Sequence, residues 1–365
     1  MYDYDKETRT LIINNREDVR NLPEKIRKEV EYFICNEKET AFEDDEDMED
    51  EDMELFAEKF RLEDMPHLKN VIICEENPDY QSIDGIVYSK DGEKLIFCPP
   101  EKKHVTIQDG TKVISVEAFA YSQISEITIP NSVETIDEFA LVSDNLTQIH
   151  FLPGSQLKNI GNGSFIGSKL EKFEFPPSVE FVGEELFNDC PVKEIYIPQE
   201  LLKKQGCLRF FTCCIDYSCG SIKTQSPAAI IVKPEGYNPV VVPRYVKWKN
   251  FKNIEADIQA FLSQKDETAP DLHKYGYYDE SKEDTAILQY QLYQSKSSKR
   301  VLTMMTKSIC ERKADEGEKE LFNFVALDDW SLDMLQYMLN IAQERNYTTV
   351  IAHILEKLAE EKNQK

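Results

Sequence analysis

The stretch VEFVGEELFNDCPVKEIYIPQ, residues 179–199, repeats a spacing of apolar residues that three earlier stretches share. These are VISVEAFAYSQISEITIPNS (113–132), VETIDEFALVSDNLTQIHFLPGSQ (133–156) and LKNIGNGSFIGSKLEKFEFPPS (157–178). Self-similarity at a period of roughly 20–50 residues is typical of stacked repeats. The four blocks therefore decide how the centre of the chain is expected to fold.

Five apolar columns and a proline define each block. The first column starts with Val116 and the second with Tyr121, five residues on, and the first-column residues are 20, 24 and 22 residues apart. The columns hold Val116, Ile136, Ile160, Val182; Tyr121, Leu141, Phe165, Phe187; Ile124, Leu146, Leu170, Val192; Ile127, Ile149, Phe173, Ile195; and Ile129, Phe151, Phe175, Ile197, followed by Pro130, Pro153, Pro176 and Pro198.

The last two columns predict a short strand in every block. Ile127 and Ile129 are two residues apart, so both side chains face one side and Thr128 faces the other. Proline then ends the strand because it has no N–H to donate. One such coil cannot bury its apolar side alone, so we expect stacked coils with a parallel sheet and a continuous core.

The glycines of NIGNGSFIGSKLEKF (159–173) raise the alternative of a phosphate-binding loop. A P-loop requires G-x-x-x-x-G-K-[ST], whereas this stretch has the order Gly-Ser-Lys, and its glycine spacing also departs from the dinucleotide fingerprint. Gly161 follows the column residue Ile160, where the other blocks carry Glu117, Asp137 and Gly183. We therefore interpret the glycines as repeat positions.

The blocks resemble the BspA-like leucine-rich repeat family, whose units read roughly I-G-x-x-A-F-x-x-C-x-x-L-x-x-I-x-I-P; the stretch 182–198 follows that pattern, including Cys190. Residues 77–116 are similar to an insert of that family that forms a hairpin before the next coil, and LKNVIICEE (68–76) would end an earlier repeat. The resemblance covers roughly residues 55–200. It implies a leucine-rich-repeat solenoid used for recognition or adhesion, without a catalytic apparatus.

The outward positions of the strands are the candidate partner-binding face, because solenoids bind proteins and peptides on such extended faces. A merely solvated face is the alternative. The positions form two polar columns, one with Thr128, His150, Glu174 and Tyr196, and one with Glu126, Gln148, Lys172 and Glu194.

Three regions are expected: an N-terminal cap (1–54), the solenoid with closing strands (55–250) and a C-terminal helical domain (251–365). The cap combines a strand at TLIIN (10–14), a helical segment at 17–37 and an acidic tract at 43–54, interpreted as a solvated loop or a lure for a basic partner. The stretch 228–248 predicts two strands closing the sheet's open edge, since an exposed edge invites aggregation. Helical periodicity follows at 254–262, 299–312 and 328–361, whereas the Tyr-rich stretch 273–284 is expected to be a surface loop.

Composition narrows the functional classes. The 365-residue chain has a net charge of −25, which disfavours nucleic acid and anionic lipid and leaves a protein or peptide partner, including a basic one. No apolar run is long enough to span a membrane, and the start lacks a signal-peptide pattern, so we expect a cytoplasmic protein unless a signal has been removed.

No motif in the sequence indicates catalysis. The five histidines form no metal-binding motif, and Cys207, Cys213, Cys214 and Cys219 lack zinc-site spacing. We therefore expect a non-enzymatic interaction scaffold with no cofactor and no metal. An exported adhesin-like role, and a ligand-binding or enzymatic role for the helical domain, stay open as alternatives.

Overall fold

The structure is a computed structural model. It describes residues 2–15, 17–38, 56–199, 201, 213–214, 226–264 and 269–363. The acidic tract 43–54 and the cysteines at 207 and 219 lie outside the described residues. The chain divides into two compact units, residues 1–213 with 221–227 and residues 214–220 with 228–365, and each is described by itself.

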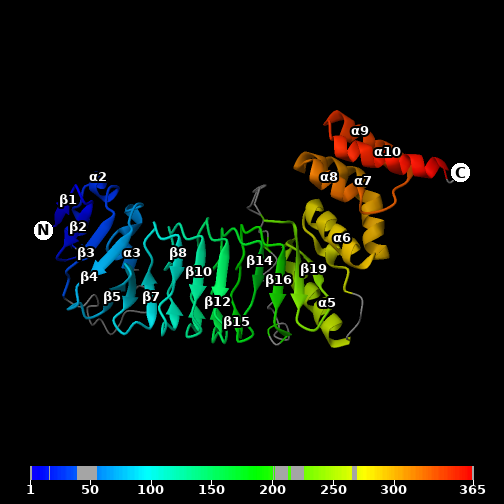
Figure 1. The fold of residues 1–365 in the computed structure, drawn as a ribbon. Helices are drawn as coiled ribbons and strands as arrows, with labels where there is room; N and C mark the ends of the chain where they lie inside the picture. Colours follow the sequence, from blue (N-terminus) through cyan, green and yellow to red (C-terminus); the bar gives the residue numbers. More distant parts are fainter. Residues whose placement is uncertain are drawn as a thin grey trace. The chain divides into compact units, whose positions relative to one another are not determined.

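The first unit begins with a four-stranded sheet in the order β1-β2-β3-β4, in which only β1 runs antiparallel to its neighbour (Figure 1). The strands are β1 (Asp3–Asp5), β2 (Thr10–Ile13), β3 (Tyr32–Cys35) and β4 (Asn70–Ile73), and short helices connect them: α1 (Glu17–Arg20), α2 (Glu24–Arg27) and α3 (Phe56–Lys59). The parallel pairing of β2, β3 and β4 shows that parallel strands already stack in the N-terminal part of the chain.

The expected helical segment over 17–37 is wrong in its second half, because Tyr32–Cys35 is the strand β3. Pro23 precedes α2 and ends any continuous helix, since it lacks an N–H and clashes with the preceding turn. The alternation in β3 buries Phe33 and Cys35 against the core of this sheet, and that tertiary burial outweighs the local helical pattern.

A hairpin separates this sheet from the repeats, as the resemblance implied. Strands β5 (Tyr80–Ile83) and β6 (Ile86–Ser89) pair antiparallel around Asp84 and Gly85, which have φ of 51° and 76°. Two successive positive φ values match the tight hairpin turn whose twist suits the flanking strands. Strand β7 (Lys94–Phe97) continues antiparallel to β6 and leads into the solenoid.

The solenoid consists of two stacks of short parallel strands with the apolar columns between them (Figure 1). One stack is β9 (Val113–Ile114), β11 (Thr135–Ile136), β13 (Asn159–Ile160) and β15 (Phe181–Val182). The other contains β8 (His104–Thr106), β10 (Glu126–Ile129), β12 (Gln148–Phe151), β14 (Lys172–Glu174) and β16 (Glu194–Ile197). The predicted parallel repeat fold is confirmed.

The first two columns of the first block are wrong by two residues, whereas its columns at Ile124, Ile127 and Ile129 are confirmed. Ile114 pairs with Ile136, and Ile114 and Phe119 are fully buried, whereas Val116 and Tyr121 are 38% and 65% exposed. The corrected spacings from Ile114 onward are 22, 24 and 22 residues. The error has a simple cause: Ile114 and Val116, like Phe119 and Tyr121, are two residues apart, so a spacing of five fits both choices.

The glycines of the third block occupy repeat positions. A Cβ on Gly161 would lie 2.5 Å from the Glu138 backbone nitrogen, and one on Gly183 would lie 2.4 Å from that of Asn162, so adjacent coils require glycine there. Gly163 has φ of 59° and shares this left-handed conformation with Glu117, Phe139 and Glu185 of the other coils. The corrected alignment places Ser115, in place of Glu117, in the column of Gly161.

The second unit contains strands and six α-helices in its described part. Strands β18 (Ala229–Pro234) and β19 (Val240–Pro243) form the expected antiparallel pair, and the short strand β17 falls at the boundary of the units in sequence. The remaining strands and α-helices are β17 (Cys213–Cys214), β20 (Tyr245–Val246), α5 (Phe251–Gln264), α6 (Asp279–Tyr293), α7 (Lys296–Glu316), α8 (Glu318–Val325), α9 (Leu332–Glu344) and α10 (Thr348–Asn363), with short 3-10 helices at Trp248–Asn250 and Leu272–Tyr275.

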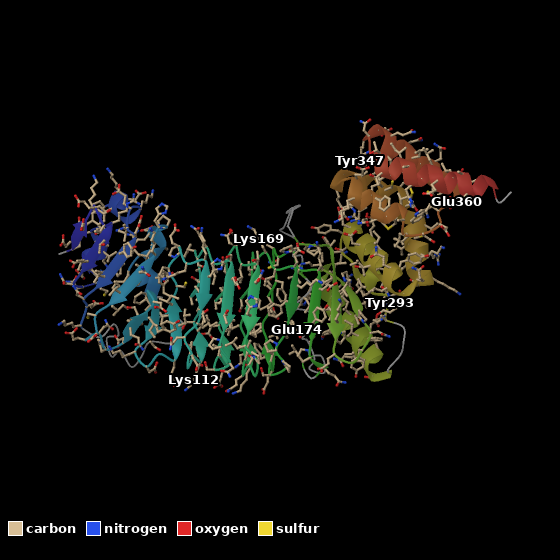
Figure 2. The ribbon with its side chains drawn as sticks, in the orientation of Figure 1. Lys112, Lys169, Glu174, Tyr293, Tyr347 and Glu360 are labelled. Carbon is tan, nitrogen blue, oxygen red and sulfur yellow. The ribbon has the colours of Figure 1, made fainter. Side chains whose placement is uncertain are left out.

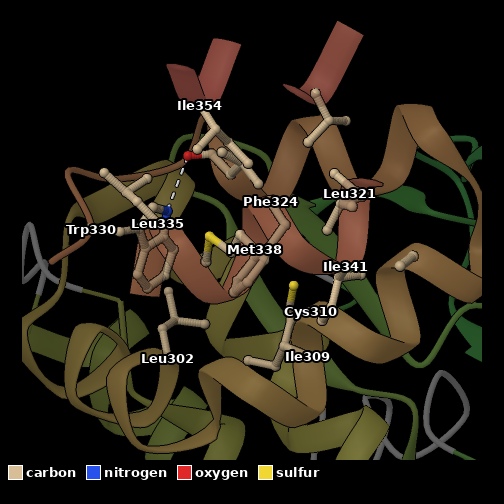
Figure 3. Close-up of a cluster of buried hydrophobic side chains, with 14 of the residues drawn as sticks. Leu302, Ile309, Cys310, Leu321, Phe324, Trp330, Leu335, Met338, Ile341 and Ile354 are labelled. Carbon is tan, nitrogen blue, oxygen red and sulfur yellow. Dashed lines mark hydrogen bonds between the residues drawn. The ribbon is translucent and has the colours of Figure 1, made fainter. Parts of the chain in front are cut away.

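Helices α6 to α10 contribute to one hydrophobic core, part of which is shown in Figure 3. Leu302 and Ile309 of α7, Phe324 of α8 and Met338 of α9 are buried in it, and the indole of Trp330 donates a 3.0 Å hydrogen bond to the Val325 carbonyl. The predicted helix pair over 328–361 is confirmed, and Ser331 is the cap of its first helix.

The surface loop expected over 273–284 is wrong. Residues from Asp279 onward form α6, and Ser281 and Glu283 are almost fully buried. Glu283 accepts hydrogen bonds from Ser308 and Arg312, both on α7. Its polarity is therefore satisfied by residues about 25 positions away, which a local pattern does not reveal.

Candidate functional site

The eight predicted face residues lie at outward positions of the stack β10, β12, β14 and β16. In the parallel pairing of β10 with β12, Glu126 lies opposite Gln148 and Thr128 opposite His150. In the parallel pairing of β14 with β16, Lys172 lies opposite Glu194 and Glu174 opposite Tyr196. Figure 2 labels Glu174 on this face, between Lys169 at one edge of the solenoid and Lys112 at the other. Each predicted column is therefore paired between β10 and β12 and again between β14 and β16, but not between β12 and β14.

Charged side chains on this face pair with one another along the stack. The Glu126 carboxylate lies 3.0 Å from His150 Nε2 and 3.3 Å from His104 Nδ1, so it is held between two imidazoles. Lys172 Nζ lies 3.2 Å from the Glu194 carboxylate. These pairs are solvent-accessible, and each contributes roughly 0–1 kcal/mol to stability. Lys172 and Glu194 pair across neighbouring strands of this face, and Glu126 lies between the imidazoles of two neighbouring strands.

The ladder of this stack is interrupted between β12 and β14. Strand β12 ends the sheet β12-β10-β8, and β14 begins another sheet with β16, whereas on the opposite side of the same coils β11, β13 and β15 stay paired. A cavity of about 660 Å³ lies along the interruption. We call it the β12–β14 groove, and its volume is within the ~300–1,000 Å³ range of ligand clefts.

The groove combines an apolar floor with a polar rim. It is lined by residues 147–155, Leu170 and residues 172–177, which include four of the predicted face residues: Gln148, His150, Lys172 and Glu174. Ile149 and Phe151 are only half-buried, whereas Ile127 and Ile129 at the same positions of β10 are fully buried. The Phe151 ring meets the edge of Phe173 at a centroid distance of 6.1 Å.

An insertion explains why the coils separate here. Eight residues lie between Phe151 and Ile160, but only six lie between Ile129 and Ile136, so the turn after β12 is two residues longer. Leu152, Pro153 and Gly154 of this turn are exposed and line the end of the groove. Sequence reasoning missed the groove, although the 24-residue block was its visible signal.

The described residues offer little support for a metal or catalytic site. No cluster of three or more His, Cys, Asp or Glu that suits a metal occurs in the described ranges. In the second unit, burial lowers the pKa of His273, whose Nε2 lies 3.0 Å from the Ser297 hydroxyl. Arg312 is half-buried, and the carboxylates of Asp284 and Glu283 raise its pKa against the opposing effect of burial. The network joins α6 to α7.

A family model described as the BspA type leucine rich repeat region matches six copies over residues 94–214. Residues 94–214 belong to the BspA-type leucine-rich repeat family. Leucine-rich repeat families are generally non-enzymatic and mediate protein–protein interaction, so the BspA-type repeats point to a role in protein interaction or surface adhesion. The insertion that opens the groove lies inside this BspA-type region.

Solved bacterial structures with similar repeats accompany this match. The pneumococcal vaccine antigen PcpA is 24% identical, with 37% of this chain and 34% of that chain covered and a TM-score of 0.34. A leucine rich cell surface protein from Faecalibacterium prausnitzii is 20% identical, with 48% and 44% covered and a TM-score of 0.35. A leucine-rich repeat protein from Eubacterium ventriosum is 14% identical, with 56% and 57% covered and a TM-score of 0.34.

The chain thus spans between about a third and somewhat over half of the length of these three solved proteins. The comparison with curated proteins gave no match. Within the described residues, no helix is long and apolar enough to cross a membrane.

Proposed function

We propose that this protein is a non-enzymatic interaction module that binds a peptide segment of a partner protein in the β12–β14 groove. The observation that carries the proposal is the interruption of an otherwise continuous stack, with half-buried Ile149 and Phe151 below a polar rim. Apolar area supplies affinity at about 25 cal/mol per Å² buried, and the rim supplies specificity.

The rim favours a partner segment that carries positive charge. No ion pair or hydrogen bond of the Glu174 carboxylate occurs among the described residues, whereas Lys172 beside it is already paired with Glu194. The chain as a whole has a net charge of −25, which attracts basic partners over a distance set by salt. A cytoplasmic scaffold and an exported adhesin would both use such a site, and fractionation of the source cells separates the two.

Selection from a random peptide library tests the proposal. Twelve-residue peptides displayed on phage are panned against the full chain, and the affinities of the enriched peptides are measured for variants. The double variant His150→Ala/Glu174→Ala, which trims the groove rim, should weaken binding by about fivefold or more, corresponding to about 1 kcal/mol.

The matched control is Thr135→Ala/Asn159→Ala, which trims outward positions of β11 and β13 on the opposite stack. It should leave the affinities unchanged. Failure of any peptide to enrich, or enriched peptides that tolerate the groove variant, would contradict the proposed function.

A further inference from the structure

Strands β12 and β14 each pair with a neighbour on the side away from the groove, β12 with β10 and β14 with β16. These pairings determine which backbone groups point into the groove. Gln148 and Leu152 donate their N–H groups to carbonyls of the β10 coil, at Ser125 and Ile129. Successive residues of a strand point their backbone groups to opposite edges. The N–H and C=O groups of Ile149 and Phe151 therefore point away from β10, into the groove.

Strand β14 presents its other edge in the same way. Phe175 donates its N–H to the Tyr196 carbonyl, and the Glu171 carbonyl accepts from Lys193, so both face β16. The alternate residues Lys172 and Glu174 therefore direct their backbone groups towards β12. Since β12 and β14 form no ladder with each other, two parallel strand edges face one groove without a strand between them.

We propose that the partner segment enters the groove as an extended strand that forms backbone hydrogen bonds with both β12 and β14. This inference rests on the proposed function and states how the partner binds. Unpaired strand edges are templates for strand addition, which is a common mode of peptide recognition. At about 3.3 Å per residue, four residues of an inserted strand match the length of β12.

The residues on either side of the groove define the sequence of the inserted strand. Its inward side chains lie beside Ile149, Phe151 and Phe173 and must be apolar. One outward position lies between His150 and Glu174, where the carboxylate without a partner favours lysine or arginine. The chain's own repeat strand SEITIPNS (125–132) already pairs on both sides in this alternating pattern.

The probe is therefore the acetylated octapeptide SEIKIPNS, which is that strand with lysine at the position of Thr128. We expect it to bind the full chain, measured by isothermal titration calorimetry. Four versions, each N-methylated at one residue of the Glu-Ile-Lys-Ile core, should each bind about fivefold more weakly or worse, because a strand paired on both edges uses every amide.

Tolerance of methylation at alternate residues would mean pairing with a single strand and would overturn insertion. Tolerance at all four would mean that the peptide lies across the face without backbone pairing. Absence of binding by SEIKIPNS at millimolar concentration would also overturn the inference. Library-selected peptides that respond to groove variants would still support the proposed function, so the two failures are distinguishable.

Charge exchange tests the placement of the lysine. Glu174→Lys should reverse the preference between SEIKIPNS and SEIEIPNS, each single change shifting the affinity about 1.4- to fivefold, as expected for an exposed ion pair. Glu185→Lys makes the same charge change at an exposed position that does not line the groove, and it should leave the ratio of the two affinities unchanged. An unchanged ratio in Glu174→Lys would exclude this register.

Discussion

Replacement of Gly161 by alanine is expected to destabilise the solenoid strongly without introducing any polar group. The new Cβ would lie 2.5 Å from the Glu138 nitrogen, 2.7 Å from the Asp137 carbonyl carbon and 2.9 Å from the Glu138 Cα. All three atoms are backbone, so no side-chain rotation relieves the overlap and the two coils must separate. Overpacking of this kind costs about 1–3 kcal/mol and sometimes more, and the rigid neighbours place Gly161→Ala near about 3 kcal/mol.

Gly110→Ala is the matched control, because Gly110 has φ of 92° and a Cβ there would meet nothing within 4 Å. It should cost only the left-handed strain of about 1–2 kcal/mol. At about 2–4 °C per kcal/mol for a unit of this size, Gly161→Ala should lower Tm by about 6–12 °C, and the control should lower it by one third to two thirds of that, about 2–8 °C.

Far-UV circular dichroism and tryptophan fluorescence are the appropriate assays. Trp248 and Trp330, the two tryptophans of the chain, lie in the second unit, so fluorescence reports on that unit, whereas far-UV dichroism reports on both. A change of the dichroism transition without a matching change in fluorescence therefore reports on the first unit. We expect the loss in Gly161→Ala to be larger in the dichroism than in the fluorescence. Equal stability of Gly161→Ala and the wild type would refute the assignment of this glycine to the close contact between coils.

Three further changes follow from individual contacts. Arg312→Met leaves the Glu283 carboxylate, 1% exposed, without its cation and should cost the helical unit about 3–5 kcal/mol, measured by the tryptophan-monitored urea transition. Burial raises the pKa of Asp137, so the folded protein favours the protonated carboxyl. The contribution of Asp137 to folding stability is therefore largest below the pKa of the unfolded chain and is lost as the pH rises. Asp137→Asn should stabilise the solenoid more at pH 7 than at pH 4 in urea titrations. Tyr121→Gly removes an exposed side chain held at φ of 67° and should raise the stability by about 0.5–1 kcal/mol, the net of relieved strain and added chain entropy; a calorimetric Tm below that of the wild type would contradict this.

The repeat architecture was predictable from the sequence because the same apolar spacing recurs in each of the four blocks. The pair Ile127/Ile129 followed by Pro130 recurs in the other three blocks, and a strand with an apolar inner side is the structure that such alternation favours. The sequence did not determine which residue of the first block occupies the first apolar column. Ile114 and Val116 satisfy the same spacing, and only the pairing with Ile136 distinguishes them.

The groove was not predictable, because the length of a repeat block does not indicate which of the two strand stacks an insertion interrupts. The two extra residues lie in the turn from β12 to β13, which has a sheet on either side. In the structure Ile160 stays paired with Ile136 while Phe173 separates from Ile149. The start of α6 escaped prediction for a related reason, since the partner that makes Glu283 tolerable in the interior is Arg312, on another helix.

Amide hydrogen exchange of the full chain, with and without saturating SEIKIPNS, tests strand insertion most directly. The account predicts slower exchange at Ile149, Phe151, Lys172 and Glu174, whose amides face the groove, and unchanged exchange in β10, whose strand is already paired on both sides. Bound peptide with no added protection at these four amides, or with protection only outside β12 and β14, would contradict it.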